Sequence, residues 1–197
     1  MTAALPDPLR VALLVAEALD ACSIRYAVGG SVASSIAGEP RSTLDVDVVV
    51  AMRDRDIDPF IAALGGEFYV DPDALRRALR DRSRANLVHH PTSIKVDLFI
   101  EGGSALDADL LARRQRVQVS ADPACHLYVH APEDILLQKL RWYRLGGETS
   151  DRQWRDALAI LIVQRDRLDE AYLSHGARVL DVADLLEQAR REATGRP

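Results

Sequence analysis

Hydrophobic and polar positions follow two different periods along the chain, and the change between them falls near residue 130. Before that point, short apolar runs typical of strands are interleaved with segments whose apolar residues recur every three to four positions, as in helices. The helices expected in this half cover residues 7–22, 31–37, 57–64, 71–80 and 106–113. The strands expected there cover residues 24–28, 44–51, 68–70, 85–89, 93–100, 116–119 and 126–130.

From Pro132 onward the apolar spacing is helical throughout. Four helices are expected, over residues 132–145, 150–164, 168–176 and 179–193. The pattern therefore predicts two parts, an α/β domain over residues 1–130 and a C-terminal helical subdomain over residues 131–197.

The composition is that of a globular protein: the 197 residues are 48% hydrophobic and 28% charged. A net charge of −5 argues against broad, sequence-blind coating of nucleic acid, although a local basic groove remains compatible with it. Cys22 and Cys125 match neither a disulfide framework nor a metal-ligand spacing, which favours buried thiols in a reducing cytoplasm. No apolar run approaches the roughly 20 residues of a membrane span, so we expect a cytoplasmic protein with no membrane partner.

Two aspartates, Asp45 and Asp47, lie in the predicted strand over residues 44–51. Residues i and i+2 of a strand point to the same side, so the two carboxylates project together. A shared cation relieves their repulsion, and oxygen ligands on a rigid strand suit Mg²⁺ or Mn²⁺. The alternative is an exposed strand face that carries two solvated acids.

The segment Gly29-Gly30-Ser31 separates a predicted strand from a predicted helix, with Ser31 expected at the N-cap. Bare backbone N–H groups and a hydroxyl at a helix N-terminus can receive a phosphate. A simple turn followed by an N-cap is the alternative. Together with an acid pair that follows after thirteen residues, the segment describes a site for a metal-bound triphosphate.

A third acid, Asp97, lies in the mostly apolar predicted strand over residues 93–100. A carboxylate in such a strand is costly to bury without a partner, and a cation shared with Asp45 and Asp47 would be one. Three carboxylates on adjacent strands can hold two metal ions about 3.5–4 Å apart, the arrangement used for in-line attack on a phosphoryl group. A solvated acid at a strand end is the alternative.

Gly29-Gly30-Ser31, followed by Arg41-Ser42-Thr43-Leu44-Asp45-Val46-Asp47, resembles the signature of the DNA polymerase β-type nucleotidyltransferase superfamily. Arg41 and Thr43 are similar to positions in its abortive-infection and toxin–antitoxin branch (AbiEii-like). Residues 92–98 resemble the strand that carries the third acid of that family, and residues 132–140 resemble the helix that follows its catalytic sheet.

The resemblance implies a nucleotidyltransferase-type mixed β-sheet flanked by helices, with residues 1–130 as the catalytic domain. It also implies a transfer of a nucleoside monophosphate from an NTP to a hydroxyl, with release of pyrophosphate and dependence on Mg²⁺ or Mn²⁺. In this scheme the glycine-serine turn binds phosphates, the three aspartates hold metal, and Asp97 is also suited to act as the base.

The sequence leaves the identity of the acceptor open. A tRNA or another RNA would make the protein toxin-like, and a cognate antitoxin protein would then be its partner. A small-molecule hydroxyl, for example on an antibiotic, would make it a resistance-type enzyme. A module of the same fold that binds nucleotide without turnover is the rival from another class.

Lys139 lies in a predicted helix whose other positions are largely apolar. Its ammonium group either reaches water along the helix surface or contacts the phosphates of the nucleotide, and the resemblance favours the second. Related toxins carry a Lys-Asp dipeptide on the next helix, and Arg155-Asp156 is the nearest match here, which assigns Asp156 to nucleotide binding.

The resemblance also assigns Arg41 and Thr43 to nucleotide or phosphate binding. For Arg41 the alternative is an ion pair with Asp45 or Asp47. Lys95 is expected to point away from the acids as a plain surface charge.

The most basic stretch of the chain is either a solvated helix face or one wall of a groove for an RNA or nucleotide substrate. It consists of Arg76, Arg77, Arg80, Arg82 and Arg84.

Overall fold

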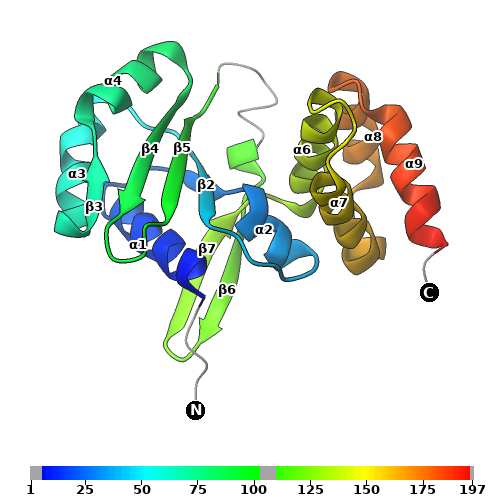
Figure 1. Cartoon of the computed structure of the whole chain (residues 1–197), viewed down its shortest axis with the longest axis horizontal. Helices are drawn as coiled ribbons and strands as arrows, with labels where there is room; N and C mark the ends of the chain where they lie inside the picture. Colours follow the sequence, from blue (N-terminus) through cyan, green and yellow to red (C-terminus); the bar gives the residue numbers. More distant parts are fainter. Residues whose placement is uncertain (1–5, 103–109, 196–197) are drawn as a thin grey trace. The chain divides into compact units, whose positions relative to one another are not determined.

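The structure is a computed structural model and describes residues 6–102 and 110–195 (Figure 1). The described residues fall into two compact units. Of the described residues, the first unit contains 6–32, 42–102 and 110–130, and the second contains 33–41 and 131–195.

Among the described residues of the first unit, seven strands form one sheet in the order β3-β4-β5-β2-β1-β7-β6. The strands are β1 (Tyr26–Val28), β2 (Asp45–Val50), β3 (Phe68–Val70), β4 (Arg84–His89), β5 (Lys95–Ile100), β6 (Gln115–Ala121) and β7 (Ala124–Val129). β2 runs parallel to β5 and β1 runs parallel to β7, whereas the other neighbouring pairs are antiparallel. The predicted mixed sheet flanked by helices is therefore confirmed.

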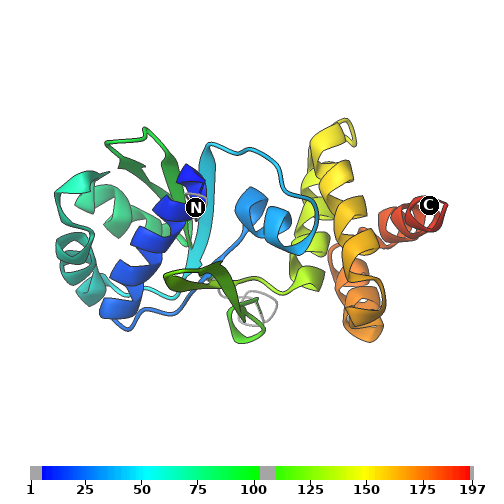
Figure 2. The same ribbon diagram turned by 90° about the horizontal axis from the view of Figure 1, so that it is seen from below.

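Two helices of the first unit, α1 (Asp7–Ala21) and α4 (Pro72–Asp81), pack against this sheet, and α3 (Ile57–Leu64) packs against both of them (Figure 2). Val46, Val48 and Val50 of β2 are buried, while the residues between them are only partly covered or exposed. Alternate strand residues point to opposite faces, so one sheet face carries the core and the other carries the polar side chains of β2. We call the second the polar face.

The second unit is helical and is built around α6 (Pro132–Leu145), α7 (Asp151–Gln164), α8 (Glu170–Val179) and α9 (Ala183–Thr194). Its core also takes in Ala33 and Ala37 of α2 (Gly30–Ala37), a helix that begins in the first unit. The Gln164 side-chain amide donates a hydrogen bond to the carbonyl of Ala37 at 2.5 Å. Residues 33–41 are thus fastened to helices that lie more than ninety residues later in the sequence.

The predicted elements are present wherever the structure describes them, with ends displaced by a few residues. Two details differ. The helix α2 begins at Gly30, so Ser31 lies in its first turn and not at the N-cap. Of the helix expected over residues 106–113, residues 106–109 lie outside the described part, and residues 110–112 are helical.

Both cysteines are free thiols and are half-buried rather than fully buried. None of the helices within residues 6–102 and 110–195 combines the length and hydrophobicity that a membrane crossing requires.

Candidate functional site

The parallel pairing of β2 with β5 brings the three predicted metal-binding aspartates onto one face of the sheet. Asp47 lies directly opposite Asp97, and Asp45 lies opposite Lys95. Paired residues of neighbouring strands point to the same face, and neighbouring strands lie about 4.8 Å apart. Three carboxylates and one ammonium group therefore share the polar face, on two adjacent strands.

Asp97 is the most buried of these acids, with 5% of its surface exposed. One carboxylate oxygen, Oδ2, lies 3.0 Å from Nζ of Lys95. The other oxygen, Oδ1, is buried and accepts no hydrogen bond from any residue that the structure describes. A buried carboxylate oxygen without a donor is unfavourable, so Asp97 retains one oxygen suited to a cation or a proton.

The expectation that Lys95 points away from the acids is wrong. Lys95 and Asp97 are residues i and i+2 of one strand and share the polar face for the same reason as Asp45 and Asp47. Sequence reasoning therefore missed Lys95 as a residue of the site, although the two-residue period of the strand was a sufficient signal.

The glycine turn contacts Asp47 directly. The N–H group of Gly29 donates to the carbonyl of Asp47 at 2.8 Å, so this predicted phosphate donor is engaged in tying the turn to β2. Gly30 has φ of +55°, and a Cβ atom at this position would lie 1.7 Å from Oδ2 of Asp47. Only glycine fits here, both because of the backbone conformation and because of the carboxylate beside it.

His130 packs against the same glycine turn. Its backbone N–H donates to Val28 at 3.0 Å, and its ring lies 3.2 Å from the position that a Cβ atom on Gly29 would take. Burial lowers the pKa of His130 from 6.5 to about 4, because the charged imidazolium would be desolvated there. The neutral ring therefore packs under the turn at neutral pH. No local sequence signal identified His130, since its neighbours come from strand pairing.

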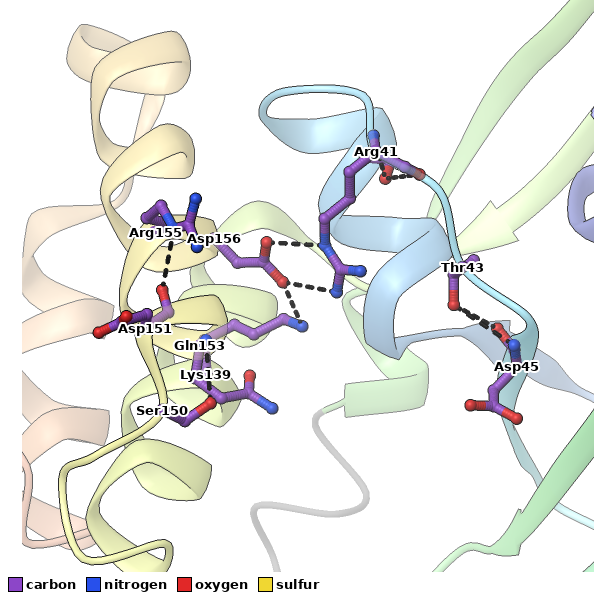
Figure 3. A network of polar contacts seen from close by, with 10 residues as sticks. Arg41, Thr43, Asp45, Lys139, Ser150, Asp151, Gln153, Arg155 and Asp156 are labelled. Atoms are coloured by element: carbon purple, nitrogen blue, oxygen red, sulfur yellow. Dashed lines mark hydrogen bonds and ion pairs between the residues drawn. The ribbon is translucent and has the colours of Figure 1, made fainter.

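Thr43 fixes the entry into β2 (Figure 3). Its hydroxyl donates to the carbonyl of Asp45 at 3.1 Å and lies 3.3 Å from the N–H group of Asp45. The side chain of Thr43 thus orients the backbone of the first acid.

In the second unit, Asp156 holds two cations (Figure 3). Nε and Nη2 of Arg41 donate to its two carboxylate oxygens at 2.9 and 3.0 Å, and Nζ of Lys139 lies 2.8 Å from Oδ2. The Lys139 side chain is only 6% exposed, so it does not extend to water. Within this unit Arg41 forms a bidentate contact with Asp156, the geometry that a guanidinium and a carboxylate favour.

The electrostatics of Asp156 follow from this arrangement. Burial by itself raises the pKa of the Asp156 carboxyl, but the hydrogen bonds and charges of Arg41 and Lys139 outweigh it and hold the pKa below its usual value. Asp156 is therefore a carboxylate in the folded protein at neutral pH.

The arginines of the basic stretch differ in the contacts that they form. Arg76 forms ion pairs with Asp58 and Asp73 at 3.2 Å, which is the behaviour of a solvated helix face. Arg84 differs, because it lies in β4 opposite Phe99 and on the polar face. Arg84 forms no ion pair within residues 6–102 and 110–195.

The donor set suits a magnesium-type ion, although the structure does not gather it into a finished site. Among the described residues, no three His, Cys, Asp or Glu side chains are grouped closely enough to hold a metal ion. Asp47 and Asp97 nevertheless lie side by side in register, and within the described ranges Oδ1 of Asp97 has no hydrogen-bond donor. Carboxylate oxygens of this kind are the ligands that Mg²⁺ and Mn²⁺ take.

No protein-family profile matches the sequence, and no curated protein matches it. Solved structures are similar to it in fold. An antigenic nucleotidyltransferase-like protein from Paracoccidioides brasiliensis is 17% identical with a TM-score of 0.51, over 94% of this chain and 92% of that chain. The antibiotic-resistance factor ANT(2'')-Ia is 13% identical with a TM-score of 0.53, over 95% and 97%. A candidate nucleotidyltransferase from H. pylori is 14% identical with a TM-score of 0.51, over 96% and 84%. The chain therefore has the fold of nucleotidyltransferase-like proteins, while the AbiEii-like branch stays a prediction.

Replacing Gly30 by alanine tests the contact between the turn and Asp47. We expect Gly30→Ala to lower the free energy of unfolding by about 2–4 kcal/mol, from a strained left-handed backbone and a clash with the carboxylate. Gly147→Ala is the matched control, because Gly147 has φ of +69° but open space around it. Urea unfolding of both variants measures the difference, and equal losses would contradict the contact.

The pKa of His130 predicts a specific pH dependence. Since the folded protein binds the proton at His130 less readily than the unfolded chain, stability falls as the pH drops from about 6.5 to about 4, by about 3 kcal/mol from this group. His130→Gln removes this part of the slope, whereas His175→Gln, at an exposed histidine, leaves it intact. Identical slopes for the wild type and His130→Gln, in urea unfolding across this pH range, would refute the assignment.

Asp156→Asn removes the counter-charge of two cations. At pH 7 we expect a loss of about 3–5 kcal/mol in the free energy of unfolding, because the variant loses a buried ionised partner of both cations. The loss shrinks as the pH falls through the lowered pKa of Asp156, since the wild-type carboxyl is then protonated too. Asp184→Asn, which breaks an exposed pair with Arg144, is the control and leaves stability nearly unchanged. A loss no greater than that of the control would rule out the buried network.

Proposed function

We propose that the protein transfers a nucleoside monophosphate from a nucleoside triphosphate to a hydroxyl acceptor and releases pyrophosphate. The observation that carries this proposal is the register of β2 and β5, with Asp47 opposite Asp97 and Gly30 against Asp47. Acids in this relation to a glycine turn suit a triphosphate bound through a divalent cation. The nucleotidyltransferase fold agrees with the proposal and does not by itself establish it.

In this proposal the glycine turn binds the phosphates of the substrate, and the acids hold the metal ion that accompanies them. The segment Gly30–Ser31 at the start of α2 receives phosphate oxygens, while Gly29 holds the turn on β2. Asp45, Asp47 and Asp97 would hold Mg²⁺ or Mn²⁺. When bound, such an ion neutralises phosphate charge and polarises the phosphoryl group.

Asp97 is the proposed general base. Oδ1 accepts the proton of the acceptor hydroxyl, while Lys95 on Oδ2 keeps the carboxylate in its orientation. The hydroxyl oxygen forms a bond to the α-phosphorus, the bond from this phosphorus to the bridging oxygen breaks, and pyrophosphate leaves with those electrons. No oxidation state changes in this transfer, so the reaction requires neither an oxidant nor a reductant.

For Arg41, Lys139 and Asp156, nucleotide binding stays a prediction from sequence resemblance. Within their own unit, Asp156 fixes the directions of both cations, which is what phosphate recognition by Arg and Lys requires. Thr43 is proposed to act indirectly, through the backbone of Asp45.

The acceptor defines two candidates. One neighbour in fold is an antibiotic-resistance factor, so a small-molecule hydroxyl is one of them. An RNA hydroxyl is the other, and a toxin–antitoxin role with a cognate antitoxin stays a prediction that accompanies it. A nucleotide-binding module without turnover is the non-enzymatic rival.

The decisive experiment incubates the protein with each α-labelled NTP, with Mg²⁺ or Mn²⁺, and with either total RNA or a small-molecule extract. Asp45→Asn, Asp47→Asn and Asp97→Asn are each expected to reduce label transfer by more than about 100-fold, because each removes a carboxylate that positions or activates the reacting groups. Thermal unfolding verifies that every variant is folded.

Asp122→Asn, at an exposed residue in the turn between β6 and β7, is the matched control and should transfer label at the wild-type rate. Transfer retained by any two of the three acid variants would overturn the site. Binding of NTP without label in either pool would favour the non-catalytic module.

A further inference from the structure

The polar face of the sheet continues beyond Asp97 onto the next two strands. Asn86 of β4 lies directly opposite Asp97, and Arg84 lies opposite Phe99. In β3, Tyr69 lies opposite Val88 of β4. Directly paired residues share a face, so Tyr69, Arg84 and Asn86 are on the side that carries the acids.

This part of the face is open. Tyr69 is 58% exposed, and Arg84 and Asn86 are also exposed. Their strand neighbours Ala85 and Leu87 are buried on the opposite, helix-covered face. A large aromatic side chain, a guanidinium group and an amide therefore stand in solvent beside the proposed base.

Each of these three groups matches a different part of a nucleotide. An exposed tyrosine ring can stack on a base, and an arginine without an ion pair can bind a phosphate. An asparagine amide can bond a base edge or a sugar hydroxyl. Arg84 forms no ion pair among the described residues, so its positive charge complements an anionic acceptor.

The spacing of these three residues fits a bound polymer whose end lies at Asp97. Arg84 and Asn86 lie on the strand adjacent to Asp97, and Tyr69 lies one strand further, with its backbone roughly 12 Å from that of Asp97. If the last nucleotides of a single-stranded polynucleotide contact Tyr69 and Arg84, the terminal hydroxyl lies near the buried oxygen Oδ1 of Asp97.

We propose that Tyr69, Arg84 and Asn86 form the acceptor surface, and that the acceptor is the end of a single-stranded polynucleotide. This inference rests on the proposed function for the role of Asp97. It selects the polynucleotide from the two acceptor classes above, on the grounds of charge, ring exposure and continuity with the acids.

The test measures binding, separately from transfer. Fluorescence anisotropy with 5′-labelled single-stranded RNA and DNA oligonucleotides, without NTP or metal, should give saturable binding to the wild-type protein. Tyr69→Ala should raise Kd by about 5- to 100-fold through lost stacking. Arg84→Met should weaken binding and reduce the slope of log Kd against log salt by about one phosphate contact. Asn86→Ala should raise Kd and alter base preference.

Matched controls separate this surface from general effects. Arg80→Met removes an exposed arginine of α4, and Trp142→Ala removes an aromatic side chain that is 55% exposed in α6. Both should bind like the wild type. Asp45→Asn should also retain binding while losing transfer, so failure of the catalytic proposal and failure of this inference give different results.

Tighter binding of RNA than of DNA, or equal binding of both, supports the proposed acceptor surface, provided that the variants lose this binding. Equal affinities of wild type, Tyr69→Ala and Arg84→Met would overturn it. The absence of binding to either polynucleotide would also overturn it. If the protein then transferred label to a small molecule, the proposed nucleotidyl transfer would still hold, and only the acceptor surface would be refuted.

Discussion

The parallel register between β2 and β5 is the constraint on which the rest of the account depends. The buried aliphatic side chains of both strands fix it, since Val46, Val48 and Val50 pair with Val96, Leu98 and Ile100 on the helix-covered face. A slip of one residue would expose these side chains, each of which contributes about 1.5–3 kcal/mol by burial, and would turn Asp97 to the wrong face. The hydrophobic core therefore holds the acids opposite one another.

The polar face contains groups that are unfavourable for folding and useful for chemistry. Asp97 is buried, and one of its oxygens accepts no hydrogen bond from residues 6–102 or 110–195, while Lys95 compensates only the other. Gly30 adopts a left-handed conformation so that the start of α2 can approach Asp47. Local rules of stability are broken at the same few residues, which is the pattern expected of a functional site.

Local periodicity was sufficient to predict most of the elements and the common face of Asp45 and Asp47. It could not reveal which strands are neighbours, and so it missed that Asn86 and Tyr69 extend the face on which Asp97 lies. The pairing of Arg41 with Asp156 joins residues 115 positions apart, and no local pattern encodes such a contact. Lys95 is a different case, because the alternation of strand side chains alone places it on the same face as Asp97.

The most direct test of the central claim is a crystal structure of the protein soaked with Mn²⁺ and a non-hydrolysable NTP analogue, read by anomalous scattering. The account predicts manganese peaks bound by Asp45, Asp47 and Asp97, with the triphosphate at Gly30–Ser31. Manganese bound elsewhere, or a nucleotide bound while these three carboxylates contact no metal, would contradict it.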